Sequence, residues 1–444
     1  MKILDFFKRV IGIFGFKNSL ERLGIKTVVS EKMSGCINRW AAMYEGGMRG
    51  RLNIPAAIAS EAARLATVEL KSSVTGSERA DFLNGEYAEV IDKIRNITEY
   101  AAAKGGVVLK PYVDGGEIKV GFVQAENFIP TSYDSSQCID GAAFLDRRFK
   151  DGKVYTRIEH HGFADGKYTV CNYVFESYSA NDLGRQINPA KTDFWREISP
   201  QVVMEGVKKP LFAYFKMPMA NIEDSSSPLG TSIYAKCTEL IEDAEKQYDR
   251  LLWEFKSGER ALYVDTNAVK RDENGREILP DERLYKLLNA DDSLFKDWTP
   301  TLREQNIING LNEILRKIEF NSGLAYGTLS IVQTTDKTAE EIRASKQRSY
   351  ATVCDIQKSL QNALCDLADC MSTLADLYEL APSGAYSVSF EFDDSIAADR
   401  KAEFTEKLQL ISAGIMAPWE FRMWYFGEDE EKAKLIVREQ SLAD

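Results

Sequence analysis

The sequence is poor in histidine and has no paired cysteines. Its two histidines, His160 and His161, are adjacent, and neighbouring side chains of a strand point to opposite faces, so they cannot share one metal ion. The seven cysteines are scattered without a C-x-x-C pair, which is typical of reduced thiols and not of a zinc site. We therefore expect no metal and no cofactor, and a surface or half-buried strand position for both histidines.

The common catalytic motifs are also missing. The chain has no G-x-x-x-x-G-K-[ST] phosphate loop, no H-E-x-x-H and no G-x-S-x-G. The acidic pairs Asp291-Asp292 and Asp393-Asp394 are the remaining metal candidates, but adjacent carboxylates are common in exposed turns and helix caps. The sequence therefore predicts a protein that is not an enzyme.

Long hydrophobic runs and an excess of positive charge are absent as well. The uninterrupted apolar segment Val10–Phe16 is too short to span a membrane. We interpret residues Met1–Phe16 as an amphipathic arm that docks on a neighbouring subunit, with binding to a membrane surface as the alternative. The net charge of -12 argues against a protein that grips a nucleic-acid backbone, although it permits one that nucleic acid slides past.

The apolar spacing predicts an α+β protein. At 444 residues the chain is too long for one ordinary core, so two to four domains or layers are expected. Helical spacing covers residues 30–70 and 82–103. The spacing then changes to two, in short runs divided by Asp114-Gly115-Gly116, Asp151-Gly152 and Asp165-Gly166, which predicts an antiparallel meander with tight hairpins.

Two amphipathic helices flank a polar excursion in the middle of the chain. After one more strand at Leu211–Phe215, a helix capped by Thr231 or Ser232 runs to Gly258. A strand and the polar segment Asp265–Asp297 follow, and a second helix covers Glu304–Phe320. The pattern predicts a helix pair that carries a small β hairpin.

A loop and a long helix come next. Residues Asn321–Asp336 contain no lysine or arginine, and their small polar residues between apolar ones favour an extended segment. Thr338 and Glu341 fit a capping box for a helix to Leu380, about 60 Å long. Such a helix is either the core of a helical domain or a bridge between layers of an assembly. Its apolar stripe is Val353, Ile356, Leu360, Leu364, Leu367, Met371, Leu374 and Tyr378.

The C-terminal part is acidic and helical. A strand at Ser387–Phe392 precedes three helices, the first of which ends at Gly414 and the others cover Pro418–Phe426 and Glu430–Glu439. Residues 391–444 hold 13 acidic and 7 basic side chains. We interpret this part as a solvated acidic cap.

The order of these parts resembles the portal protein family of tailed bacteriophages, especially the branch found in phages and prophages of Gram-positive bacteria. Five segments carry the resemblance and together cover nearly the whole chain. They are Ile37–Gly46 (INRWAAMYEG), Ser232–Ala235 (SIYA), Ser322–Ser330 (SGLAYGTLS), Lys337–Ile342 (KTAEEI) and Phe390–Ile396 (FEFDDSI) with Asp399.

The resemblance implies a homo-oligomeric ring, usually of twelve subunits, at one capsid vertex of the virion, assembled in the cytoplasm of the bacterial host. Double-stranded DNA would pass through it during packaging and ejection. Its partners would be the terminase motor, the head-tail connector, and the major capsid and scaffolding proteins. The implied parts are an arm and wing (1–228), a first stem helix (229–258), a clip (259–302), a second stem helix with the tunnel loop (303–336), a long wing helix (337–380) and a crown (381–444).

The resemblance also implies functional residues. The tunnel loop, which would project into the channel, consists of Gly327, Thr328, Leu329, Ser330, Ile331, Val332, Gln333, Thr334, Thr335 and Asp336. The clip residues that would contact the motor or connector are Asp272, Asn274, Arg276 and Glu282. A loop without basic residues is consistent with a low-friction channel, because each phosphate contact adds affinity that movement must break.

Two other interpretations remain. An enzyme of the packaging apparatus is disfavoured by the missing phosphate loop. A structural or adaptor protein with a long helix and a β module, unrelated to phages, is the other alternative.

Overall fold

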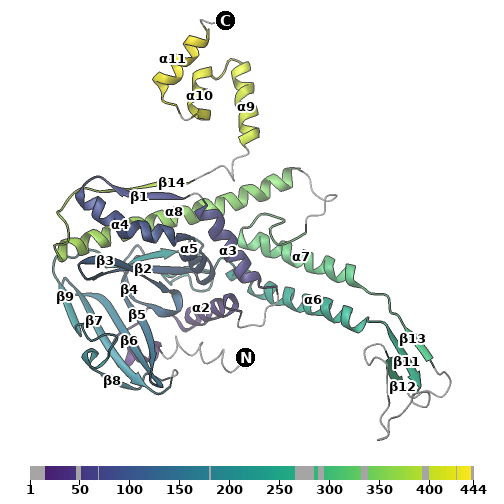
Figure 1. Ribbon diagram of the computed structural model, residues 1–444, viewed down its shortest axis with the longest axis horizontal. Coiled ribbons are helices and arrows are strands. Elements are labelled where there is room, and N and C mark those ends of the chain that lie inside the picture. The colour runs from purple at the N-terminus through teal and green to yellow at the C-terminus, as the bar shows by residue number, and fades with distance from the viewer. Residues whose placement is uncertain are drawn as a thin grey trace. The chain divides into compact units, whose positions relative to one another are not determined.

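The computed structural model describes residues 16–46, 52–68, 70–179, 182–265, 285–288, 295–331, 339–392, 400–426 and 428–441. The chain divides into two compact units, one of residues 1–67 and 71–390 and one of residues 68–70 and 391–444. The first combines helices with antiparallel and mixed sheets, and the second contains three helices (Figure 1). The predicted α+β class is confirmed.

The N-terminal helices begin at residues suited to helix starts. The Ser30 hydroxyl accepts the N–H of Met33 at 3.1 Å, and Pro55 lies in the first turn of α3, where no N–H is needed. The single helix predicted over 82–103 is wrong, because two helices meet at Lys93 (φ -97°, ψ -1°) and the apolar spacing continues across the junction. These helices are α2 Glu31–Tyr44, α3 Ile54–Thr67, α4 Glu78–Asp92 and α5 Ile94–Lys104.

Most of the predicted meander forms a sheet in the order β4-β5-β6-β7-β8, with β9 also paired to β7, whereas its first hairpin, at Asp114-Gly115-Gly116, belongs to a second sheet. Its turns confirm the Asp-Gly prediction. Asp151 and Gly152 have φ of +52° and +73°, and Asp165 and Gly166 have +51° and +75°, the left-handed pairs that two-residue hairpins require. The strands are β4 Phe128–Tyr133, β5 Ile139–Lys150, β6 Lys153–Ala164, β7 Lys167–Ser177, β8 Arg185–Ile187 and β9 Gln201–Met204.

A second sheet has the order β10-β2-β3, and the long helix α8 (Ala339–Leu377) contacts β10 and β2 (Figure 1). The predicted stripe of α8 is buried from Ile356 to Leu374, whereas Val353 is half-buried and Tyr378, beyond the helix end, is exposed. Much of α8 is therefore a core helix of its unit. The strands are β2 Gly106–Asp114, β3 Glu117–Gln124 and β10 Ala213–Lys216.

Two helices, α6 (Thr238–Ser257) and α7 (Glu304–Ser322), pack together and carry a small sheet. Its order is β12-β11-β13, so the predicted hairpin is a three-stranded sheet in its described part. The predicted start of the first helix at Thr231 or Ser232 is wrong, because α6 begins at Thr238. Residues 229–234 lie against α5, where the N–H of Ile233 donates to the carbonyl of Ala102 at 2.9 Å. The strands are β11 Ala261–Asp265, β12 Tyr285–Leu288 and β13 Phe295–Trp298.

The smaller unit consists of α9 (Arg400–Ser412), α10 (Pro418–Phe426) and α11 (Glu430–Ser441). The rings of Phe404 and Phe421 lie 5.4 Å apart and join α9 to α10. Gly414 ends the first helix in a left-handed conformation (φ +69°), which confirms the predicted stop.

Several sequence predictions have no structural test. The N-terminal arm, apart from Phe16, and the capping residue Thr338 lie outside the described residues.

A further pair of strands joins distant parts of the chain, because β1 (Lys71–Thr75) pairs with β14 (Ser387–Glu391). Across the described parts of the chain, no helix is long and apolar enough to cross a membrane.

Candidate functional site

The loop after α7 begins at Gly323, whose φ of +74° is left-handed. The N–H of Leu324 donates to the carbonyl of Glu319 at 2.9 Å, which is the hydrogen-bond pattern of a glycine-ended helix. A Cβ atom at Gly323 would lie 2.5 Å from Oγ1 of Thr352 in α8. Glycine is therefore needed here both for its backbone conformation and for the close approach of α8.

The basic first half of α8 meets the end of α7 at a second contact. The guanidinium carbon of Arg348 lies 4.2 Å from the centre of the Phe320 ring. A cation over an aromatic face at this distance is attractive. The start of the loop is therefore enclosed between two helices.

A buried carboxylate organises the next residues of the loop. Glu319 is fully buried (0% exposed), and its Oε1 accepts the N–H groups of Gly327 (3.1 Å), Leu329 (2.6 Å) and Ser330 (2.8 Å). The hydroxyl of Ser330 donates to Oε2 at 2.8 Å. Three converging amides and a hydroxyl replace the water that a buried carboxylate loses.

Asn312, two turns earlier on α7, holds the following residue. Its Oδ1 accepts the N–H of Ile331 at 2.7 Å, and its Nδ2 donates to the carbonyl of Ile331 at 3.2 Å. The described loop residues consequently form turns along α7. The extended conformation predicted for this part is wrong, because its amides bond to side chains of the helix instead of to a strand.

The structure describes only part of the predicted functional set. In the predicted tunnel loop, Gly327–Ile331 are described and Val332–Asp336 are not. Ser330 is buried at 7% exposure, whereas Ile331 is 64% exposed. All four predicted clip residues, Asp272, Asn274, Arg276 and Glu282, lie outside the described residues.

The sequence prediction missed Glu319 and Asn312, although a signal was present. They are seven residues apart and directly follow Ile318 and Leu311, which are also seven apart and buried. Residues at this spacing share one face of a helix. Polar side chains on the apolar face of α7 mark positions that need a hydrogen-bond partner from elsewhere.

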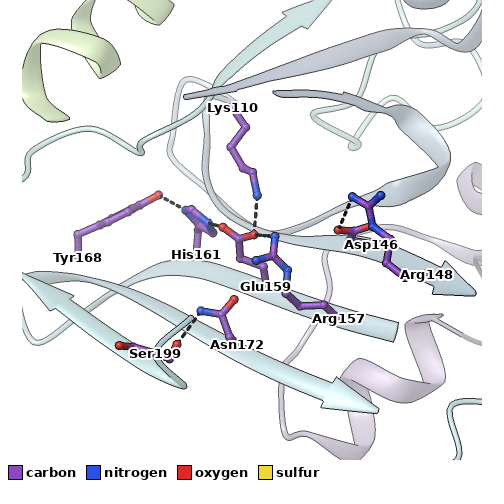
Figure 2. A network of polar contacts seen from close by, with 9 residues as sticks. All are labelled: Lys110, Asp146, Arg148, Arg157, Glu159, His161, Tyr168, Asn172 and Ser199. Carbon is purple, nitrogen blue, oxygen red and sulfur yellow. Dashed lines mark hydrogen bonds and ion pairs between the residues drawn. The ribbon is translucent and has the colours of Figure 1, made fainter. Parts of the chain in front are cut away.

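A second, largely buried carboxylate, that of Glu159, lies between the meander sheet and the β10-β2-β3 sheet, with its side chain 13% exposed (Figure 2). Glu159 of β6 binds Lys110 of β2 at 2.5 Å and Arg157 at 2.6 Å through Oε2, while its Oε1 bonds to Nε2 of His161 at 2.8 Å. Nδ1 of His161 is 2.8 Å from the hydroxyl of Tyr168, which accepts the N–H of Leu211 at 2.9 Å. This network joins the meander to the β10-β2-β3 sheet.

The protonation states of Glu159 and His161 follow from their burial and from the charged side chains around them. Burial alone would raise the pKa of Glu159, but Lys110, His161 and Arg157 together hold that pKa well below its usual range. Burial lowers the pKa of His161, so its ring is neutral at pH 7 and donates through Nε2 to Glu159 while Nδ1 accepts from Tyr168.

The two histidines lie on opposite faces of β6, as their adjacency in a strand requires. The predicted half-buried position is right for His160 and wrong for His161, which is only 5% exposed. The sequence could not show that Phe212 and Tyr168 would cover its ring.

No group of side chains suited to a metal ion occurs in the described portion of the chain. The acidic pairs Asp291-Asp292 and Asp393-Asp394 lie outside it.

The fold is thus a mixed helical and antiparallel-sheet structure in which a helix pair carries a small sheet at one end and an anchored loop at the other (Figure 1). The family model "Phage portal protein, SPP1 Gp6-like" matches residues 67–443, and the chain belongs to this family. No curated protein matches the chain. Among solved structures, the neck of a native GTA particle computed with C12 symmetry matches 90% of this chain and 95% of its own, with a TM-score of 0.45 and 9% identity.

Proposed function

We propose that the protein forms the ring, of twelve subunits, at one vertex of a phage capsid through which double-stranded DNA is packaged and ejected. The family match over residues 67–443 carries this proposal. The ring binds the terminase motor during packaging and the head-tail connector afterwards, and it contacts the major capsid and scaffolding proteins. It is built in the cytoplasm of the bacterial host and serves as a structural component without catalysis.

The helix pair and its loop are the parts that act on DNA in this proposal. Residues 327–336 form the tunnel loop that faces the channel. Two observations support this role: the segment 321–336 has no lysine or arginine that would hold phosphates, and Ile331 is exposed where the described part of the loop ends.

The other parts take the roles that portal subunits divide among themselves. Residues 1–228 and the long helix form the wing, α6 and α7 the stem, and α9–α11 with the preceding strand the crown. The sheet of β11, β12 and β13 belongs to the clip, in which Asp272, Asn274, Arg276 and Glu282 contact the motor or connector.

Electron microscopy of the purified protein tests the ring directly. We expect rings with a central hole in negative stain and no hydrolysis of ATP by the rings alone. Monomers without ATPase activity would favour the adaptor interpretation, which family membership already disfavours. ATPase activity would instead indicate a motor enzyme.

A double substitution tests the loop. Ile331→Asp with Val332→Asp places two negative charges at the expected channel wall, so we expect normal rings but fewer DNA-filled heads, measured by complementation of a portal-deficient phage. The matched control is Ile222→Asp with Val203→Asp, which changes two exposed apolar residues elsewhere (55% and 50% exposed). Failure of only the loop variant to form rings would show that the loop is a subunit contact.

A further inference from the structure

Two buried polar side chains of α7, Glu319 and Asn312, bond to the loop. Glu319 and Asn312 are 0% and 7% exposed. Their carboxylate and amide accept four N–H groups and one hydroxyl, and Asn312 donates to one carbonyl, all from residues 327–331. Every one of these partners lies in the first half of the predicted tunnel loop.

We propose that Glu319 and Asn312 are positioning residues that fix the point and direction at which the channel loop leaves α7. This role rests on the proposed function of the loop. The two side chains form a clamp, here defined as Glu319 and Asn312 with their partners in residues 327–331.

The cost of burying Glu319 supports a positioning role. An apolar side chain would fill the same space without desolvating a charge, so packing alone gives no reason for a carboxylate. Within the described part of the chain its partners are neutral donors of the loop. The favourable energy of this carboxylate is therefore obtained only when residues 327–330 adopt their observed turns.

The helix that carries the clamp, α7, is itself bound to α6. At the other end of α7, Arg303 donates its backbone N–H and its guanidinium to Glu254 of α6, with Nη2 2.9 Å from Oε2. The position of α7 is thus set by α6, and the clamp transfers that position to the loop. A loop placed in this way would lie at the same height in every subunit of a ring.

Hydrogen exchange tests the clamp without reference to DNA. In Glu319→Leu the amides of Gly327, Leu329 and Ser330 lose their acceptor, and we expect them to exchange at least about tenfold faster, with Glu319→Gln intermediate because it keeps one oxygen. Glu313→Gln, a change at an exposed position of the same helix (61% exposed), is the matched control. Equal exchange in all variants would overturn the clamp.

A second measurement tests the positioning role. In phage complementation, Glu319→Leu is expected to form rings at normal yield and thermal midpoint but to reduce the number of DNA-filled heads, with partial rescue by Glu319→Gln. If Glu319→Leu does not fold, Glu319→Gln and Ser330→Ala take its place, because each removes part of the same hydrogen-bond set.

Asn312 gives an independent comparison. Asn312→Ala removes both the acceptor of the Ile331 N–H and the donor to the Ile331 carbonyl, whereas Asn309→Ala makes the same change at an exposed position one turn earlier. Only Asn312→Ala should speed the exchange of the Ile331 amide and lower packaging.

The outcomes separate this role from the proposed function. Faster exchange with normal packaging would overturn the positioning role and leave the portal function standing. Wild-type protein that forms no rings would overturn the portal function, whatever the exchange rates. Loss of rings in parallel with packaging, in every clamp variant, would show that the residues serve general stability.

Discussion

Glu159 and Glu319 of the larger unit are both largely shielded from solvent, but their carboxylates bind different kinds of partner. Glu159 is bound by side chains of two strands, Lys110 of β2 and Arg157 and His161 of β6, with Lys110 and Arg157 both within 2.6 Å of one oxygen. Glu319 has backbone N–H groups and one hydroxyl of a single loop as its partners in the described structure. One carboxylate joins two sheets, and the other shapes one segment of backbone.

The difference follows from how strictly each kind of partner restricts the backbone conformation around the carboxylate. Long side chains such as lysine reach a carboxylate from many backbone positions, so an ion pair can connect elements without fixing their main chain. A backbone N–H has no such freedom, and three of them can converge on one oxygen only in a particular set of turns. A carboxylate bound by backbone amides therefore determines local conformation.

The largest expected effect is at Glu159. Glu159→Gln leaves Lys110 and Arg157 as neighbouring buried cations without their shared anion, and we expect a loss of about 3–5 kcal/mol of stability. The thermal midpoint measures this loss. Glu176→Gln on the neighbouring strand, where the side chain is 27% exposed and pairs with Lys153, should change it little. Similar midpoints for the two variants would show that the ion pairs of Glu159 contribute no more stability than the more exposed ion pair of Glu176.

Substitution of Gly323, at the start of the loop, is expected to cause a smaller loss of stability. Gly323→Ala combines the cost of a left-handed alanine, about 1–2 kcal/mol, with a clash against Thr352. Gly46→Ala is the matched control, because Gly46 has a similar φ of +71° and no atom within 4 Å of a new Cβ. The excess destabilisation at Gly323 should shrink when Thr352→Ala is added. Equal losses at the two glycines would show that α8 does not press on the loop.

The smallest expected effect is the change with pH of the stability that the Glu159 network contributes. The native pKa values of His161 and Glu159 lie below their ordinary values of 6.5 and 4.5, so each group binds a proton less readily in the native state than in the unfolded chain. Their stabilisation is complete above those ordinary values and is lost as the pH falls toward the native values. The thermal midpoint should therefore begin to fall below about pH 6.5.

His161→Gln tests the first part of this decline. In this variant the decline of the thermal midpoint that begins near pH 6.5 should be reduced to the part that His160 contributes, and the fall in acid that Glu159 causes should remain. His160→Gln, on the other face of the strand, measures the part that His160 contributes, because burial lowers the pKa of His160 as well. An unchanged slope in His161→Gln would assign the pH dependence to His160 or to other groups.

Elements with strong local signals were predictable. The Asp-Gly hairpins of the meander, the glycine stops at Gly258 and Gly414, and the apolar stripe of α8 from Ile356 to Leu374 all agree with the structure. Each depends on the conformational preference of one or two residues or on a regular apolar period. Elements set by distant contacts, such as the non-helical segment 229–234 against α5, were predicted wrongly.

By itself, the sequence determined that the chain has an α+β fold, an apolar long helix and a loop free of basic residues, because composition and spacing act locally. Only the tertiary structure decided which polar residues matter in that loop. The place of Glu319 and Asn312 on the apolar face of α7 indicates that they need hydrogen-bond partners, but it does not show that residues 327–331 supply them. Every residue except proline carries a backbone amide, so the identity of the loop residues does not reveal which of them complete the clamp.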